Sequence, residues 1–122
     1  MCAAIMTHNM HLDTVYYNYI KDGKKIYETR VYDEKRQQIK LLDIIEFKDR
    51  QSGEVFEAKV VELAYFDDFR EAISSVGIKK VLPNAKSMEK GISIYENFDD
   101  GNYKLNAQKF GVLRMKFKII NK

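Results

Sequence analysis

The sequence predicts an α+β domain in which a small β-barrel is surrounded by packed helices. Segments that alternate between apolar and polar residues, as half-buried strands do, lie near both ends of the chain, and helix start and stop signals lie between them. The chain has 122 residues, enough for one hydrophobic core but too few for two. We therefore expect a flexible extension over residues 1–9 and one domain over residues 10–122, with the terminal strands closing the barrel.

Helices are predicted from the residues that begin and end them. Asp13, Asp67 and Ser87 are good N-caps ahead of apolar residues at helical spacing, and Gly23 and Gly77 are natural stops. The predicted helices cover residues 13–22, 67–76 and 87–97, and the predicted strands cover residues 7–12, 25–31, 39–47, 55–63 and 111–120.

Alternation of side chains decides which residues of a strand share a face. In the strand over 25–31, it places Glu28 and Arg30 on one face and Lys25 and Tyr27 on the other. The segment 49–53, which ends in glycine, is typical of a hairpin turn between two antiparallel strands.

Charge and cysteine content limit the classes of protein that fit. The formal net charge of +3 is too small to indicate nucleic-acid binding by itself. The one cysteine, Cys2, allows no internal disulfide, which fits a reducing compartment. No stretch looks like a secretion signal or a membrane span. We expect a cytoplasmic protein that has no membrane partner.

The common catalytic and cofactor-binding signatures are missing from the sequence. There is no Walker loop, no dinucleotide-binding glycine motif, no H-E-x-x-H and no nucleophile elbow. His8 and His11 are three residues apart, a spacing that suits one side of a metal site or an ordinary strand, but no third ligand is evident. The sequence predicts neither a metal nor a cofactor.

The segment 23–30 concentrates charge around a glycine turn. Lys25 is suited to contact phosphate, or to act as a nucleophile or base if burial lowers its pKa. Arg30 offers a planar fork of donors, and Glu28 can pair with either cation and position it. A structural ion pair on an ordinary strand is the alternative interpretation.

Gly23, Lys25, Glu28 and Arg30 stand at G-x-K-x-x-E-x-R spacing, and this run resembles the signature of the ASCH domain family (activating signal cointegrator homology), itself similar to the RNA-binding PUA domain. Other segments resemble that family's pattern in the same order: 39–47, 60–69, 82–89, Tyr95 and 110–113. One departure is Leu42 before Asp43, where the family usually has glycine, so the turn there must be made differently or relaxed.

The resemblance implies a PUA-like barrel whose cleft binds RNA or a nucleotide-like ligand, in a protein of RNA processing or transcription regulation. The residues implied to bind the ligand are Gly23, Lys24, Lys25, Tyr27, Glu28, Arg30 and Tyr95. Lys25 and Arg30 would hold a phosphate or a base edge, and Tyr27 or Tyr95 would stack on a base. For each tyrosine, packing in the core is the simpler interpretation.

The resemblance also implies two enzymatic alternatives and leaves a role in protein interaction open. Some family members deacylate N-acetylcytidine with the signature lysine as nucleophile, so Lys25, Glu28 and Glu89 would be the catalytic residues, with Glu96 as a weaker carboxylate. Glu28 replaces a threonine of those enzymes and would favour the ammonium form of Lys25. Ribonuclease activity, with a lysine and a glutamate as acid and base, is the other alternative.

Overall fold

The computed structural model describes residues 4–98 and 101–121 and shows a mixed α+β fold. The elements are, in chain order, β1 (Thr7–Leu12), α1 (Thr14–Lys21), β2 (Tyr27–Val31), the 3-10 turn η1 (Arg36–Gln38), β3 (Ile44–Asp49), β4 (Val55–Phe66), α2 (Phe69–Ser74), α3 (Ile78–Val81), α4 (Met88–Glu96), α5 (Asn102–Phe110) and β5 (Val112–Asn121).

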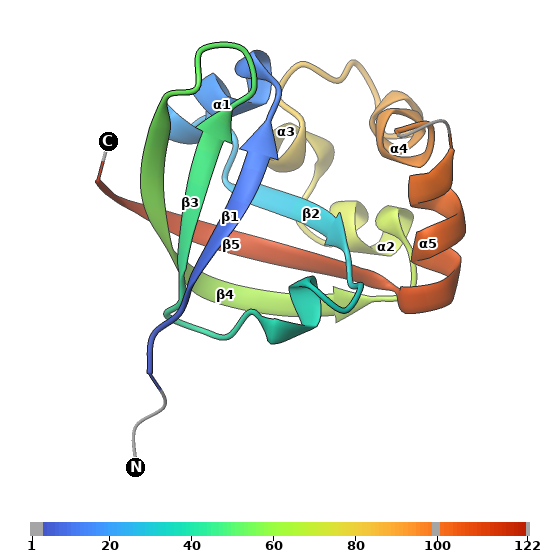
Figure 1. Ribbon diagram of the computed structural model, residues 1–122. Coiled ribbons are helices and arrows are strands. Elements are labelled where there is room, and N and C mark those ends of the chain that lie inside the picture. The colour runs from blue at the N-terminus through green and yellow to red at the C-terminus, as the bar shows by residue number, and fades with distance from the viewer. Residues whose placement is uncertain (1–3, 99–100, 122) are drawn as a thin grey trace.

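One curled five-stranded sheet forms the body of the molecule, and its strands run in the order β1-β3-β4-β5-β2 (Figure 1). The β1–β3 pair is parallel, and the other three pairs are antiparallel. Helices α2, α4 and α5 lie together beside β2, whereas α1 lies at the end of the barrel near β3. The helices therefore cover one side of an open, barrel-like sheet.

The terminal strands do not close the barrel, contrary to the expectation from sequence. β1 pairs with β3, and β5 lies between β4 and β2. The sheet is therefore a half-barrel whose two edge strands are β1 and β2. A side chain joins these edges, since Arg30 Nη2 of β2 donates to the His11 carbonyl of β1 over 3.1 Å.

Two hydrophobic clusters pack against the sheet, one inside the half-barrel and one under the helices. The cluster inside the half-barrel consists of Met10, Leu12, Tyr17, Ile20, Ile39, Ile45, Phe47, Phe56, Ala58, Val60, Leu113 and Met115. The cluster under the helices consists of Tyr27, Val31, Phe69, Ala72, Ile73, Val81, Leu82, Ala85, Ile92, Tyr95, Ala107 and Val112. Adjacent residues of β5 go to different clusters, because side chains alternate across a strand.

Most predicted elements are present, with shifts at their ends. The helix predicted over 13–22 is α1, with Asp13 and Asp22 as its caps. Asp68, not Asp67, caps α2 and accepts from the Glu71 amide. β1 begins at Thr7, so residues 7–9 belong to the sheet and not to a flexible extension.

A helix cap and a hairpin turn predicted from the sequence are both present. Ser87 caps α4 as predicted and accepts from the Lys90 amide over 3.2 Å. The hairpin turn is also confirmed, with the Gly53 amide donating to the Asp49 carbonyl over 2.9 Å.

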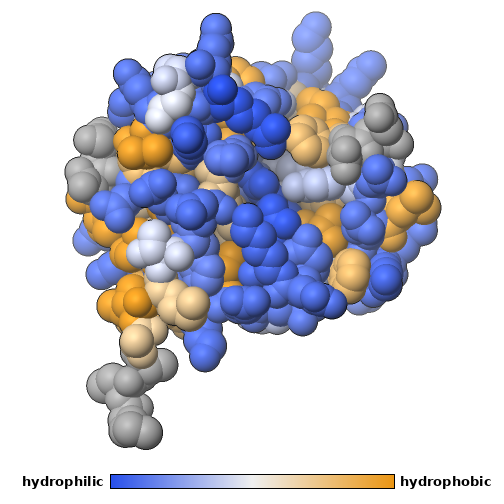
Figure 2. Space-filling model, viewed as in Figure 1, coloured by the Kyte–Doolittle hydropathy of each residue, from blue (hydrophilic) through white to orange (hydrophobic). Residues whose placement is uncertain are grey.

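The face of the molecule shown in Figure 2 is mainly hydrophilic, with smaller apolar patches. In the described part of the chain, no helix is long and apolar enough to cross a membrane.

Leu42 makes the turn at which the sequence departs from the family pattern. Its φ is +73°, the left-handed conformation that glycine adopts at little cost and other residues rarely adopt. The Leu42 amide donates to the Val60 carbonyl over 2.8 Å, and Asp43 Oδ2 accepts from the Lys40 amide over 3.0 Å. The tight turn is therefore kept, at the cost of strain at Leu42.

Candidate functional site

A pocket lies at the opening of the half-barrel, where the ends of β1 and β2 face α4 and α5. Its enclosed space is about 60 Å³, and the volume rises to about 470 Å³ when the open space at its mouth is included. A ligand larger than a few water molecules would therefore lie mainly in the mouth. Its walls are formed largely by aromatic and aliphatic side chains, and its floor carries Lys25, Glu28 and Arg30. The open edge of the sheet thus creates the space that a closed barrel would fill.

Lys25 is buried at the floor of this pocket, with 2% of its surface exposed. It precedes β2, so the alternation predicted from the sequence does not apply to it, and its side chain reaches Glu28. The Nζ group donates to the Val81 carbonyl and to the Tyr95 hydroxyl, and lies 3.2 Å from Glu28 Oε1. Burial lowers the pKa of Lys25, and the Glu28 carboxylate opposes this shift.

Glu28 is the centre of the charged cluster. Its Oε1 accepts from the Tyr95 hydroxyl over 2.9 Å and from the Thr29 amide over 3.0 Å, and its Oε2 accepts from Arg30 Nη2 over 3.2 Å. Burial alone would raise the pKa of Glu28, but the charges of Lys25 and Arg30 hold it below its usual value. Glu28 is therefore ionised and binds both cations.

Arg30 keeps donors available for a ligand. Only its Nη2 donates within the described part of the chain, to Glu28 Oε2 and to the His11 carbonyl. Nε and Nη1 have no hydrogen-bond partner among the described residues, and because they lie on different edges of the guanidinium, each can donate separately to an oxygen atom of a phosphate or a base.

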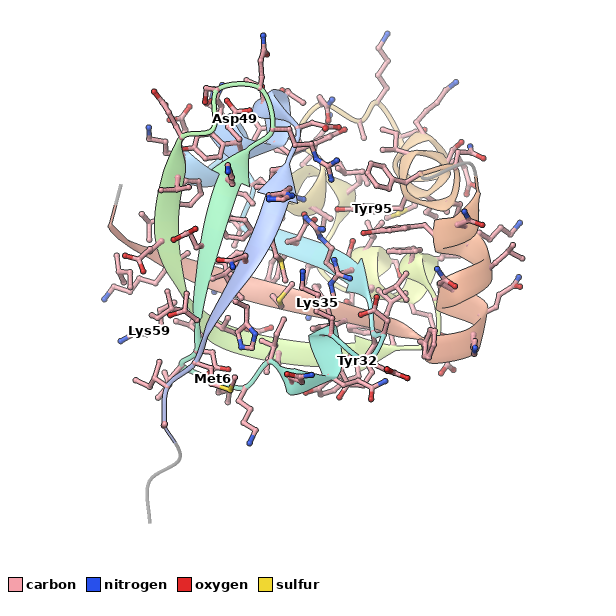
Figure 3. The ribbon with its side chains drawn as sticks, viewed as in Figure 1. Met6, Tyr32, Lys35, Asp49, Lys59 and Tyr95 are labelled. Carbon is pink, nitrogen blue, oxygen red and sulfur yellow. The ribbon has the colours of Figure 1, made fainter. Side chains whose placement is uncertain are left out.

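Tyr95 connects the floor of the pocket to its aromatic wall. It projects from α4 and bonds both Lys25 and Glu28 through its hydroxyl (Figure 3). Its ring stacks on Phe69 with centroids 4.9 Å apart, and Tyr103 of α5 stacks on Phe69 with centroids 6.1 Å apart. Burial raises the pKa of the Tyr95 hydroxyl well above its usual value, so it remains a donor.

The mouth of the pocket carries a pair of opposite charges. Arg50, from the β3–β4 hairpin, lies 3.5 Å from Asp13, and its guanidinium lies 5.9 Å from the centre of the Phe98 ring. Because this pair is neutral overall, the buried Lys25, Glu28 and Arg30 give the site a net charge of +1. The site therefore favours an anionic or oxygen-rich ligand.

Some residues predicted to act in the site lie elsewhere. Gly23 and Lys24 are exposed on the turn after α1 and do not line the pocket. Tyr27 is buried in the cluster under the helices, where its ring lies 4.9 Å from the Arg114 guanidinium. Glu89 is also outside the pocket, because the first turn of α4 points it to solvent, where both its oxygens pair with Arg70.

Other residues line the pocket without having been predicted. Tyr16 of α1 and Tyr103 of α5 contribute to its aromatic wall, Arg50 stands at its mouth and Thr29 at its floor. The Lys25 ammonium lies 5.8 Å from the centre of the Tyr16 ring. Thr29 lies within the motif, next to Glu28, whereas Tyr16, Arg50 and Tyr103 come from distant segments that folding brings next to Lys25.

The two histidines considered as metal ligands differ in their surroundings. His8 Nε2 lies 2.8 Å from Asp43 Oδ2, which connects β1 to the start of β3. The His11 side chain is exposed at the end of β1. Within residues 4–98 and 101–121, no group of three His, Cys, Asp or Glu residues is placed to hold a metal ion.

Comparison with known proteins gives one family and several similar structures. The sequence pattern of the ASCH domain matches residues 10–118. The crystal structure of hypothetical protein PH0355 is 38% identical, with a TM-score of 0.82 over 94% of this chain and 100% of that chain. The solution NMR structure of PF0455 from Pyrococcus furiosus is 35% identical, with a TM-score of 0.73 over 94% of this chain and 98% of that chain.

A more distant structure has the same fold. ASCH from Zymomonas mobilis is 14% identical, with a TM-score of 0.63 over 92% of this chain and 66% of that chain. The comparison with curated proteins finds no match.

Proposed function

The chain belongs to the ASCH domain family, with its PUA-like fold, and we propose that the pocket at the opening of the half-barrel binds one nucleotide of an RNA or a nucleotide-like ligand. In this proposal a base enters between the aromatic side chains, and Arg30 donates to its oxygen atoms or to the adjacent phosphate. Lys25 and Glu28 fix the position of Arg30 and supply charge.

The observation that carries this proposal is a buried cationic cluster beneath aromatic walls. Lys25, Glu28 and Arg30 are each less than 10% exposed and have a net charge of +1. Burying this much charge costs several kcal/mol per ion unless the groups are paired. The free donors of Arg30 beside the rings of Tyr95 and Tyr103 match the two parts of a nucleotide, which are a flat base and an anionic backbone.

The proposal is tested by measuring the affinity for a short single-stranded RNA over a range of salt concentrations. We expect Arg30→Gln to weaken binding roughly 5- to 150-fold if the guanidinium reads a base edge. If it contacts a phosphate, the slope of log affinity against log salt becomes shallower by about 0.7. Lys118→Gln removes the same charge at an exposed position outside the pocket and is the matched control.

Two further results decide the test. Thermal unfolding of Arg30→Gln must show a folded protein, and Tyr103→Ala, which leaves the ion cluster complete, should also weaken binding. If Arg30→Gln, Tyr103→Ala and Lys118→Gln all bind as the unchanged protein does, RNA does not occupy this pocket.

Deacylation of N-acetylcytidine is a second candidate, favoured by the buried Lys25 at the floor of the pocket. Burial lowers the pKa of Lys25, which increases the neutral amine that a nucleophile requires. Three acceptors nevertheless surround Nζ, namely the Val81 carbonyl, the Tyr95 hydroxyl and Glu28 Oε1, and together they suit an ammonium with three protons. Glu89, the expected second carboxylate, lies on the surface.

We therefore expect no release of acetate and cytidine from N-acetylcytidine by the intact protein. Chromatography of the reaction mixture at high protein concentration measures this directly. Release by the intact protein and by Glu89→Gln, but not by Lys25→Ala, would establish an amidohydrolase that does not use Glu89 and would overturn the preference for binding.

A further inference from the structure

We propose a second nucleotide-binding surface at the far ends of β2 and α5, which receives the neighbouring nucleotides of the RNA strand. This inference rests on the proposed function, because one nucleotide of the same strand occupies the first pocket. The surface is a shallow hollow lined by Tyr32, Tyr65, Asp67, Lys109 and Phe110, among others.

Aromatic rings form the base-binding part of this surface. Tyr65, near the end of β4, is 55% exposed, so much of its ring is open to solvent. Its ring meets Tyr32 edge to face, with centroids 4.9 Å apart. The backbone holds Tyr32 in place, because its amide donates to the Gly111 carbonyl over 2.9 Å and its carbonyl accepts from Gln37 over 3.0 Å. Tyr65 is thus a supported ring whose face is available for stacking.

Charged groups of both signs complete the second surface. The Lys109 ammonium lies 5.0 Å from the centre of the Phe110 ring and is placed for contact with a phosphate. Asp67 supplies an acceptor suited to a ribose hydroxyl. A cation, an acceptor and an aromatic face together match one nucleotide.

The two sites lie along the same two elements. β2 carries Glu28 and Arg30 in the first pocket and leads directly to Tyr32 in the second, while α5 has Tyr103 near its start in the first pocket and Phe110 at its end in the second. The separation along β2 from Arg30 to Tyr32 is about 7 Å, and that along α5 is about 10 Å. A strand of at most two to three nucleotides spans this distance, since a stacked nucleotide advances about 3.4 Å and an unstacked one advances further.

The test compares uridine monophosphate with the single-stranded pentamer of uridine, whose bases stack weakly on one another. We expect the unchanged protein to bind the pentamer more tightly than the mononucleotide. Tyr65→Ala should weaken pentamer binding at least about fivefold and leave mononucleotide binding unchanged. Tyr65→Phe keeps the ring and should bind the pentamer as the unchanged protein does.

The outcomes separate the two proposals. If the unchanged protein binds both ligands and Tyr65→Ala binds the pentamer equally well, the second surface is refuted and the first pocket stands. If the unchanged protein binds neither ligand, the proposed function fails, and the proposal of a second surface fails with it. Lys109→Gln adds an independent readout, since loss of one phosphate contact should make the salt dependence of pentamer binding shallower by about 0.7.

Discussion

At the scale of single residues, Glu28 holds the candidate site together. Among the described residues, it is the carboxylate that pairs with both Lys25 and Arg30, and without it two buried cations would face each other. Removing one member of a buried ion pair typically destabilises a protein by about 3–5 kcal/mol. Glu28 therefore contributes to the stability of the fold as well as to the site.

The pH dependence of stability tests this role of Glu28. The pKa of its carboxyl is lowered in the folded protein, so it stabilises the fold above its unfolded value of 4.5, and this contribution is lost as the pH falls through the folded pKa. The difference in free energy of unfolding between the unchanged protein and Glu28→Gln should be largest at neutral pH and should narrow below pH 4.5. Urea denaturation over a series of pH values measures it.

A constant difference across that range would contradict the account, because it would mean that Glu28 keeps the same proton occupancy when the protein folds. Asp43 and Asp49 also have lowered pKa values, owing to hydrogen bonds such as those from His8 and Thr14. Both proteins retain these groups, so their effects cancel in the comparison.

Leu42 provides a separate test of backbone strain. A side chain in the left-handed conformation costs about 1–2 kcal/mol, and Leu42 gains little from burial because it is 54% exposed. We expect Leu42→Gly to raise the free energy of unfolding by about 0.5–1 kcal/mol, after the greater freedom of glycine in the unfolded chain is included.

Leu41 is the matched control for this substitution. Leu41 is also exposed, at 56%. Its φ is negative, because Leu42 is the one non-glycine residue with a positive φ within the described ranges 4–98 and 101–121. Leu41→Gly should therefore destabilise the protein by about 0.5–1 kcal/mol. Equal losses of stability in both variants would show that strain at Leu42 is negligible.

The charged residues of the site could be predicted from the sequence, whereas the aromatic residues of its walls could not. Lys25, Glu28 and Arg30 were predicted together because they lie within one short motif. Tyr16 and Tyr103 were not predicted, because their position in the pocket depends on how α1 and α5 pack. A motif specifies neighbours in the chain, whereas the walls of a pocket come from neighbours in space.

At the scale of elements, the contact between α3 and α4 depends on the lack of a side chain at Gly91. A Cβ atom there would overlap Ile78 Cδ1 and would lie 3.0 Å from Ile78 Cγ1. Because the overlap falls on the end of a half-buried, flexible side chain, moving it should cost about 1–2 kcal/mol, and alanine favours a helix by about 1 kcal/mol. Gly91→Ala should therefore destabilise the protein by about 1 kcal/mol or less.

Ile78→Val removes the overlapping methyl group and provides a double-mutant test. Ile78→Val alone should lower the free energy of unfolding by about 0.5–1.5 kcal/mol. The double variant should lose less stability than the sum of the losses in the two single variants. Simple additivity in thermal or urea unfolding would show that Gly91 and Ile78 do not limit this packing.

Two helices, α3 and α5, were not predicted from the sequence, and each lacks the pattern by which a helix is recognised. α5 buries Ala107 and has a largely polar sequence, so it lacks the apolar stripe by which a helix is recognised. α3 has four residues, which is too short for a periodic pattern. The strands were found because their alternating residues pack on both sides of the sheet.

At the scale of the whole molecule, the open sheet positions the site. Because β5 pairs with β4 and β2 and not with β1, the edges of the half-barrel stay apart at the pocket. Two helices, α4 and α5, then cover that opening and supply the rings of Tyr95 and Tyr103. The sequence predicted the α+β class and the order of strands along the chain, but not this pairing, which depends on contacts between distant segments.

The most direct test of the central claim is a nuclear magnetic resonance titration of the ¹⁵N-labelled protein with a short single-stranded RNA. It needs no substitution, so no effect on folding intervenes. We predict that the largest changes in amide chemical shift occur at Thr29, Arg30 and Tyr95, around the pocket. Changes confined to the basic residues of β5, such as Lys116 and Lys118, or no changes at all, would contradict the assignment of this pocket as the nucleotide site.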